Sequence, residues 1–404
     1  MERKKSFNQE KIQIVNRCLV LDLIRQQIIC SRSTLASLSG LRLMTITNII
    51  NELMSCGLVV ETGLMNGNRG RRSIGLKLND DKYKVIGIRM TRSVFYVGLF
   101  GLSGQIYQKK KYIVSHNEDV EVTIARIRSA IQLTLNENMD CFILSAAIAI
   151  PGPYREDIDR LLFVTELPGW QNYPIKEALT KNLEIPLYII NDADASAFSQ
   201  YWYRNKRYLL YVLAGQGIGS GLVVEGKLAR GSTGLGGEFG HTTINFNGPK
   251  CQCGNHGCIE KYCSLLVLYE NIKTRLKTKE PSCLSIDNIT TETISEAVKN
   301  GDPIACEEYK KVCCLLSIGI VNLVNQFNPE IIVLGDELTQ IEPGLLLSIV
   351  NDKIQQCTQL LVQKNLTVEI NPLSESPSLL GAGAIAAQHI IDDPSCIIKQ
   401  KSNN

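Results

Sequence analysis

Three cysteines in the second half of the chain are spaced closely enough to bind one metal ion. The cysteines are Cys251, Cys253 and Cys258, and two glycines, Gly254 and Gly257, lie between the last two of them. The glycines allow the backbone to turn sharply, so that three thiolates can converge. Three thiolates and one imidazole form the closed tetrahedral shell of a structural zinc site, and His256 is a candidate fourth ligand by proximity. The alternative is that these are ordinary reduced cysteines of a core.

A second set of side chains, near the N-terminus, is suited to contacting nucleic acid. Apolar residues at helical spacing predict a helix over residues 42–56. Its other faces carry mainly short hydrogen-bonding side chains: Arg42, Thr45, Thr47, Asn48 and Asn51. A recognition helix in the major groove of DNA needs such a surface.

The segments around this helix predict a winged helix-turn-helix over residues 1–80. The other expected elements are a helix over 8–26, a second helix that starts at the N-cap Ser33, and a wing whose two strands cover 58–61 and 74–78. The DNA contacts predicted outside the third helix are all arginines: Arg32, Arg69, Arg71 and Arg72. Those of the wing would lie against phosphates or in a minor groove. The alternative is a small helical dimerisation module with a solvated basic hairpin.

Charge is distributed unevenly along the chain. Residues 1–80 contain 12 Lys and Arg against 6 Asp and Glu, a balance of +6. The whole chain carries +3, so the remaining residues sum to −3. A basic head on a slightly acidic body indicates that the head meets a polyanion.

The body, residues 81–404, has the sequence pattern of a duplicated α/β domain. The first copy is a meander of three strands, then a helix and a buried strand, expected over 85–90, 94–100, 105–113, 120–136 and 142–150. A strand over 187–190 leads into a further helix, and then the meander recurs over 208–213, 220–224 and 227–229. This repetition predicts the duplicated actin-like fold of sugar kinases, in which ligands bind between the two halves.

Three motifs carry a resemblance to a known family: GQGIGSGLVVEGKLARG at 215–231, GGEFGHTTI at 236–244 and CQCGNHGCIE at 251–260. They resemble the signature of the ROK family, named for repressors, open reading frames and kinases. Residues 8–78 resemble the winged head of its repressor branch, which includes repressors of xylose and N-acetylglucosamine operons. The resemblance implies an α/β protein with an N-terminal winged helix-turn-helix and a duplicated actin-like (ribonuclease H-like) sugar-kinase-type domain. The ligand cleft of that domain would lie near residues 190–260.

The resemblance also implies the residues of two sites. His241 would complete the zinc site, and the zinc would be structural. The family's sugar-contacting positions correspond here to Asn191, Asp192, Glu238, His241 and Glu260. A sugar presents hydroxyl groups, and binding them requires donors and acceptors held rigidly around the ring. Taken alone, Asp192 could merely cap a helix.

Departures from the family's kinases predict that this chain is not an enzyme. Those kinases carry an Asp-x-Gly-Gly-Thr loop whose backbone approaches the nucleotide phosphates. Here residues 88–93 read Ile-Arg-Met-Thr-Arg-Ser, without aspartate or glycine. In the second loop Gln216 replaces the usual threonine, and Asp336 stands where a second glycine is usual. Asp192, the family's catalytic base, is retained. A role in sugar binding alone would explain why this residue is present.

The predicted function is a DNA-binding repressor of carbohydrate genes that a sugar or sugar phosphate releases from its operator. A hexose, a pentose, an N-acetylated amino sugar and a 6-phosphate are all compatible effectors. One alternative is an ATP-dependent sugar kinase with a DNA-binding head, and another is a regulator held by a partner protein. The resemblance implies a homodimer or homotetramer on an operator with two half-sites.

The composition argues against a membrane protein. No apolar run reaches the roughly 18 residues that a membrane span needs. Most of the 14 cysteines lie singly in apolar runs, as is typical of reduced thiols in the cytoplasm. We therefore expect a cytoplasmic protein.

Overall fold

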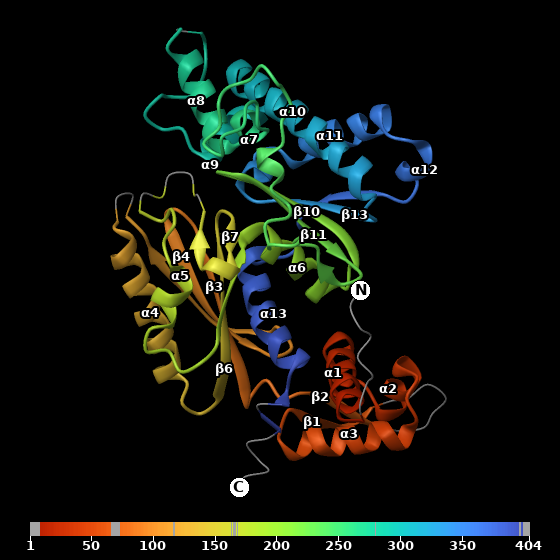
Figure 1. Ribbon diagram of the computed structural model, residues 1–404. Helices are drawn as coiled ribbons and strands as arrows, with labels where there is room; N and C mark the ends of the chain where they lie inside the picture. Colours follow the sequence, from red (N-terminus) through yellow and green to blue (C-terminus); the bar gives the residue numbers. More distant parts are fainter. Residues whose placement is uncertain are drawn as a thin grey trace. The chain divides into compact units, whose positions relative to one another are not determined.

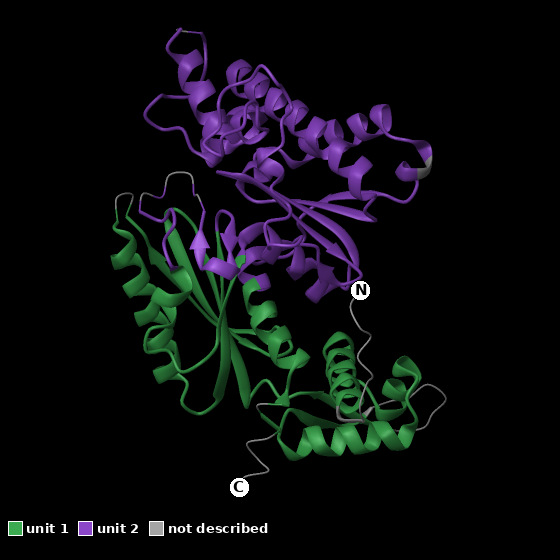
Figure 2. Ribbon diagram, viewed as in Figure 1, with its two compact units in different colours: residues 1–150, 175–190, 382–404 green, residues 151–174, 191–381 purple. Residues whose placement is uncertain are grey.

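The computed structural model describes residues 9–65, 73–115, 118–162, 164, 167, 169–278, 280–395 and 397–398. The predicted wing contacts Arg69, Arg71 and Arg72 lie outside these residues. The chain divides into two compact units, shown in different colours in Figure 2. Unit 1 comprises residues 1–150, 175–190 and 382–404, and unit 2 comprises residues 151–174 and 191–381.

Three helices and a two-stranded antiparallel sheet form the N-terminal head (Figure 1). They are α1 (Gln9–Gln27), α2 (Arg32–Ser39), α3 (Leu43–Ser55), β1 (Val59–Met65) and β2 (Ser73–Leu78). These elements confirm the predicted winged helix-turn-helix. The predicted N-cap of the second helix was wrong, because the Ser31 hydroxyl, not that of Ser33, accepts the backbone N–H of Thr34 at 3.1 Å. Ser33 already lies within the first turn.

The apolar stripe of α3 forms the core of the head. Ile46, Ile50 and Leu53 are completely buried. α1 adds Leu21 and Ile24, which are also buried. The stripe leaves the opposite face of α3 to carry the polar residues predicted to read DNA.

Each unit contains a five-stranded sheet, and both sheets have the same strand order. The strands of unit 1 are β3 (Tyr83–Met90), β4 (Val94–Gly101), β5 (Ile106–Ile113), β6 (Phe142–Ile150) and β9 (Leu187–Asn191). Those of unit 2 are β10 (Tyr208–Ala214), β11 (Ile218–Val224), β12 (Lys227–Leu228), β13 (Ile331–Gly335) and β14 (Thr367–Ile370). The orders are β5-β4-β3-β6-β9 and β12-β11-β10-β13-β14. In each, an antiparallel meander continues into a parallel strand beside its first strand. This repetition confirms the duplicated actin-like architecture.

Helices cover both faces of the sheet in unit 2. Leu210 and Val212 of β10 pack into a core with α8 (Leu265–Leu276), α10 (Pro303–Phe327) and α11 (Pro343–Cys357). Leu209 and Tyr211 pack on the opposite face, against α6 (Asp192–Arg204). Successive strand residues point to opposite faces, so β10 is apolar throughout. The sheet thereby fixes α6, whose first residue is a predicted sugar contact.

The remaining helices, short strands and turns complete the two units. The helices are α4 (Val120–Glu137), α5 (Ile175–Thr180), α7 (Glu260–Cys263), α9 (Thr291–Lys299), α12 (Leu360–Gln363) and α13 (Pro377–Asp392). The short strands and 3-10 turns are β7 (Tyr154–Arg155), β8 (Arg160–Leu161), η1 (Glu156–Ile158), η2 (Phe239–His241) and η3 (Glu337–Gln340). No helix in the described part of the chain combines the length and the apolar character needed to cross a membrane.

Candidate metal and effector sites

The predicted zinc ligands converge within unit 2. The donor atoms of His241, Cys251, Cys253 and Cys258 all lie within 4.8 Å of one another. Sγ of Cys253 is 3.7 Å from Sγ of Cys258, and Sγ of Cys251 is 3.6 Å from Nδ1 of His241. With Zn–S near 2.3 Å and Zn–N near 2.0 Å, the edges of a tetrahedral site measure about 3.5–3.8 Å. Both of these distances match the edges of a tetrahedral zinc site, and the other donor pairs lie within 4.8 Å.

The acid–base chemistry of these thiols also fits a bound cation. Burial, followed by the neighbouring thiols of Cys253 and Cys251, raises the pKa of Cys258 to about 12. Three thiolates so close together repel one another unless a cation lies between them. Nδ1 of His241 faces the sulfur of Cys251. With a metal ion on Nδ1, Nε2 would carry the proton of the neutral ring and could donate a hydrogen bond. This geometry is compatible with both roles predicted for His241.

A tight hairpin brings the cysteines together. Gly257 has a φ of +63°, and a Cβ at this position would lie 1.7 Å from the carbonyl oxygen of Asn245. Only glycine fits such an approach. Lys250 pairs with His256 across the hairpin, and the side chain of His256 is exposed. His256, the alternative ligand by proximity, lies outside the group of converging donors.

The five residues predicted to bind a sugar all belong to unit 2. Asn191 is the N-cap of α6, where its Oδ1 accepts the backbone N–H groups of Ala193 at 2.9 Å and Asp194 at 3.4 Å. Its Nδ2 donates to the carbonyl of Gly152 at 3.1 Å. The capping role considered for Asp192 thus belongs mainly to Asn191. Asp192 is the first residue of the helix, so its carboxylate lies at the helix N-terminus.

Glu238 and Glu260 approach the start of β11 from two directions. Oε2 of Glu260 accepts the backbone N–H of Ile218 at 3.1 Å. A Cβ at Gly240 would lie 2.0 Å from the carbonyl oxygen of Ile218 and 3.5 Å from Oε2 of Glu260. The segment that carries Glu238 and the helix that begins at Glu260 therefore meet at one backbone position.

Carboxylates gather around Glu238. Burial raises the pKa of Glu238 to about 7, and the nearby charges of Asp192, Asp194 and Glu260 add to the shift. Two other predicted sugar residues, Asp192 and Glu260, are therefore near enough for their charges to act on Glu238. Such a group provides hydrogen-bond acceptors for the hydroxyls of a polyol.

Two residues near this group were not predicted from the sequence. Asp194 is 4% exposed, and its Oδ2 lies 3.2 Å from Nε of Arg230, which is 25% exposed. Burial raises the pKa of Asp194 to about 7, whereas the charge of Arg230 lowers it. The sequence contained one usable signal, an aspartate two residues after Asp192 that α6 would bury on the sheet.

The two turns compared with the phosphate loops of kinases follow β3 and β10. In unit 1, the turn after β3 is closed by Thr91, whose hydroxyl donates to the carbonyl of Val94 at 2.9 Å. In unit 2, a Cβ at Gly215 would lie 2.5 Å from Oε2 of Glu337 and 3.0 Å from Oδ2 of Asp336. Asp336 has a φ of +79°, a region that non-glycine residues rarely adopt. Two carboxylates therefore lie against this second turn.

The DNA contacts predicted on α3 lie at its N-terminal half. Arg42 and Asn48 are exposed, and Thr45 and Thr47 are half-buried. The hydroxyl of Thr47 donates to the carbonyl of Leu43 at 2.8 Å, so it is already hydrogen-bonded within the helix. Arg32 forms an ion pair with Glu61 at 3.1 Å, so it also ties α2 to the first strand of the wing.

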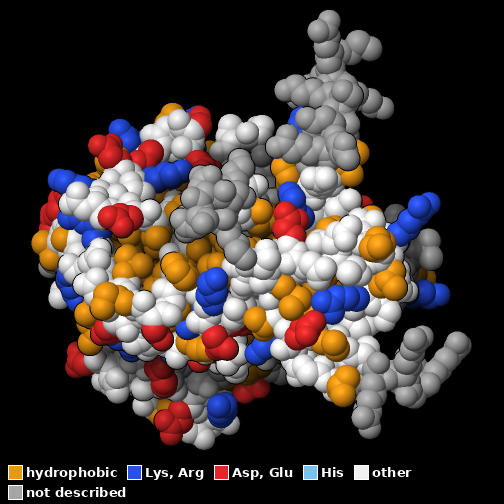
Figure 3. Space-filling view, turned by 90° about the horizontal axis from the view of Figure 1, so that it is seen from below, with side chains coloured by type: hydrophobic (Ala, Val, Ile, Leu, Met, Phe, Trp, Pro, Cys, Tyr) orange, Lys and Arg blue, Asp and Glu red, His pale blue; other side chains and the backbone are white. Residues whose placement is uncertain are grey.

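Two exposed apolar side chains on α3 were not predicted as DNA contacts from the sequence. Leu43 and Met44 are 54% and 71% exposed at the helix N-terminus. Apolar side chains at this end of a recognition helix can contact thymine methyl groups. On the face seen in Figure 3, Lys and Arg side chains are interspersed with Asp and Glu, not gathered into one patch.

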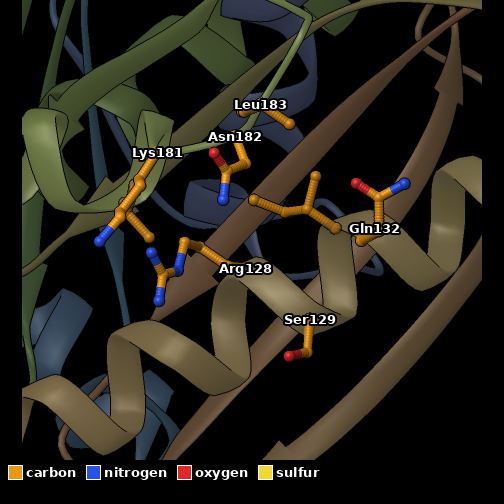
Figure 4. Close-up of a pocket in the computed structure, with 8 residues that line it drawn as sticks. Arg128, Ser129, Gln132, Lys181, Asn182 and Leu183 are labelled. Carbon is orange, nitrogen blue, oxygen red and sulfur yellow. The ribbon is translucent and has the colours of Figure 1, made fainter.

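A cleft in unit 1 contains none of the predicted site residues. Its volume is about 410 Å³, and it lies at α4 and the end of α5 (Figure 4). Its lining combines apolar and polar side chains: Arg128, Ser129, Ile131, Gln132, Leu179, Lys181, Asn182 and Leu183.

Glu238→Gln is expected to stabilise the sugar-free protein at pH 8, by about 1–2 kcal/mol. The pKa of Glu238 is raised in the folded state, from 4.5 to about 7. The unfolded state therefore releases this proton first, and stability falls as pH rises from about 4.5 to about 7. Urea unfolding at pH 5 and pH 8 measures the effect, which should be smaller at pH 5. The exposed Glu184→Gln is the control, and a Glu238→Gln protein less stable than wild type at pH 8 would contradict the prediction.

Comparison with known sequences places these sites in a family context. The family model described as the ROK family matches residues 85–389. The chain is 30% identical over 396 residues to a xylose repressor from Caldicellulosiruptor bescii. That match covers 96% of this chain and 99% of the relative, so it includes the head as well as the body.

Solved structures give the same picture at the level of the fold. A ROK family transcriptional regulator, a homologue of the Escherichia coli Mlc protein, matches with a TM-score of 0.81 and 26% identity. This match covers 96% of the present chain and 98% of the regulator. A ROK family glucokinase from Streptomyces griseus, in complex with glucose and AMPPNP, matches with a TM-score of 0.66 and 23% identity. It covers 76% of the present chain and 99% of the kinase, and it supports the fold alone.

Proposed function

This chain belongs to the ROK family, and we propose that it is a transcriptional repressor whose hold on operator DNA is controlled by a sugar. The observation that carries the proposal is similarity over the whole length, head included, to a xylose repressor and to a solved transcriptional regulator. The glucokinase match covers a smaller share of the chain.

DNA binding is assigned to the head, residues 1–80, and effector binding and self-association to residues 81–404. The acting species is a homodimer or homotetramer that presents two heads to two operator half-sites. In each head, α3 lies in the major groove with Asn48 and Thr45 toward base edges. Arg42 contacts phosphate, as do the arginines of the wing.

The effector proposed here is an uncharged sugar. Asp192, Glu238 and Glu260 present carboxylate oxygens, to which sugar hydroxyls donate hydrogen bonds. Burial is the main cause of the raised pKa of Glu238, and the nearby carboxylates that add to it would also repel a phosphate dianion. Arg230, the cation near this group, already faces Asp194. These charges favour a neutral pentose or hexose over a sugar phosphate.

A structural zinc ion fits the donor set of His241, Cys251, Cys253 and Cys258. When bound, the ion would cross-link the cysteine hairpin to His241, with no open coordination position for catalysis. Glu238 and Glu260 flank these ligands in the sequence, and a rigid junction would hold both carboxylates in place for the sugar. Nε2 of His241 would donate a hydrogen bond to the same ligand.

Kinase activity is the second candidate function, and Asp192 is the residue that favours it. A base alone does not transfer phosphate, because the nucleotide must be held in line by loops and metal. Residues 88–93 lack the aspartate and glycines of a phosphate loop. The carboxylates of Asp336 and Glu337 lie against the other loop. We therefore propose that the chain binds sugar without phosphorylating it.

The test combines DNA release with an assay for turnover. DNA selected from a random library by the wild-type protein serves as the operator. D-xylose, D-glucose or N-acetyl-D-glucosamine is expected to weaken operator binding at least about tenfold, an effect that is absent with D-glucose 6-phosphate. None of the sugars should promote ADP formation from ATP. Failure of all three sugars to alter DNA binding would contradict sugar control, and sugar-dependent ADP formation abolished by Asp192→Asn would establish the kinase instead.

A further inference from the structure

Arg230 and Asp194 form an ion pair at the edge of the proposed effector site. Nε of Arg230 lies 3.2 Å from Oδ2 of Asp194. The carboxylate is 4% exposed, so it has lost nearly all its water, whereas the guanidinium remains 25% exposed. A carboxylate buried to this extent needs a charged partner to stay ionised. Removing the partner would leave an uncompensated group beneath the site.

Arg230 also closes the loop that leads to Glu238. Its carbonyl accepts the backbone N–H of Gly236 at 2.9 Å. A Cβ at Gly236 would lie 2.9 Å from the carbonyl carbon of Arg230, so the two ends of this loop touch. The next residue, Gly237, is fixed to β11, because its carbonyl accepts the hydroxyl of Ser220 at 3.1 Å. Glu238 follows directly on this fixed position.

Asp194 belongs to the element that carries the other sugar residues. It lies in the first turn of α6, two residues after Asp192. Its backbone N–H is bonded by Oδ1 of Asn191 at 3.4 Å. A displacement of the Asp194 side chain would therefore also move the start of α6, which carries Asn191 and Asp192.

We propose that the Arg230–Asp194 ion pair is a positioning pair, which holds the loop of Glu238 against the start of α6. This inference rests on the proposed function, since it concerns the same effector site. The pair fixes the separation between the carboxylates of Glu238 and Asp192, which repel each other. Without it, the two carboxylates move apart and no longer face one sugar ring.

A double-mutant cycle tests the pair with wild-type protein, Asp194→Asn, Arg230→Met and the double variant. D-xylose, D-glucose and N-acetyl-D-glucosamine are the probes, and calorimetric affinity is measured well below the unfolding temperature. Each single substitution is expected to weaken sugar binding at least about tenfold. The double variant should be no weaker than the poorer single variant, because both remove one interaction. Arg230→Lys, which keeps the charge, should recover part of the affinity.

The matched control is Arg204→Met. Arg204 lies at the other end of α6 and pairs with Glu369, with a similar exposure of 22%. Its loss should lower the melting temperature and leave sugar affinity unchanged, which separates positioning from general stability. Zinc content and sugar-free operator binding should match wild type in all the variants.

Two results would overturn the positioning role. One is sugar affinity within twofold of wild type in folded Asp194→Asn and Arg230→Met proteins. The other is a double variant in which the two losses simply add. If wild-type protein binds none of the three sugars, the proposed function fails and this inference fails with it. Normal wild-type binding with unaffected variants removes only the inference.

Discussion

Protein with the substitution Cys258→Ser is expected to retain less than about a tenth of an equivalent of zinc, against about one per wild-type chain. A serine hydroxyl is a far poorer zinc ligand than the fully buried thiolate it replaces. The stability of the hairpin depends on metal binding, so we expect a loss of several kcal/mol in unfolding free energy. Metal analysis after preparation without chelator measures the first effect, and urea unfolding measures the second.

Two control variants isolate the metal from the effects of substitution. Cys263→Ser changes an equally buried thiol in the neighbouring α7 and should keep its zinc. His256→Ala removes the exposed histidine of the hairpin and should also keep it. A Cys258→Ser protein with a full equivalent of zinc would contradict the donor set. Zinc loss with normal sugar response would instead show that the metal does not hold Glu238 and Glu260.

The large features of the fold were predictable because they depend on local patterns. Short apolar runs separated by turns indicated each strand of the two meanders, and the structure has them within a few residues of the expected bounds. The identical strand order of the two sheets then follows from the repeated pattern. The α3 stripe was equally clear, since its residues recur at helical spacing and are buried. The family and the repressor function, predicted from the motifs, are confirmed by the relatives.

The details of the sites were harder to predict because they depend on contacts between distant segments. Ser31 and Ser33 are equally good N-cap residues, and only the backbone geometry selects Ser31. The partnership of Arg230 with Asp194 joins a loop to a helix, and no local pattern signals it. The contact between Glu260 and the backbone of Ile218 arises in the same way. The predicted sugar contacts and DNA contacts remain predictions, as does the boundary between head and body near residue 80.

The effector group has a cost in stability that follows from its chemistry. Burial, and then the charges of three nearby carboxylates, raise the pKa of Glu238 to about 7. A folded protein tolerates such repulsion where the charges serve a ligand. The hydroxyls of a bound sugar would donate hydrogen bonds to these carboxylates in place of the water lost on folding. Sugar binding would therefore also relieve the repulsion among the carboxylates. This explains why Glu238→Gln should stabilise the protein and impair its response together.

The second large effect is expected in the head, where Asn48→Ala should remove most of the preference for the selected operator over unrelated DNA. Asn48 is exposed on α3, and an asparagine amide can bond an adenine edge with two hydrogen bonds worth about 1–3 kcal/mol. Arg42→Ala should instead weaken binding to all sequences alike and reduce the salt dependence, because a phosphate contact releases counterions without reading bases. Fluorescence anisotropy on both DNAs at several salt concentrations separates the two effects. Ser55→Ala, at the far end of the same helix, is the control and should bind as wild type does. Equal losses on both DNAs for Asn48→Ala would show that α3 does not read bases through this residue.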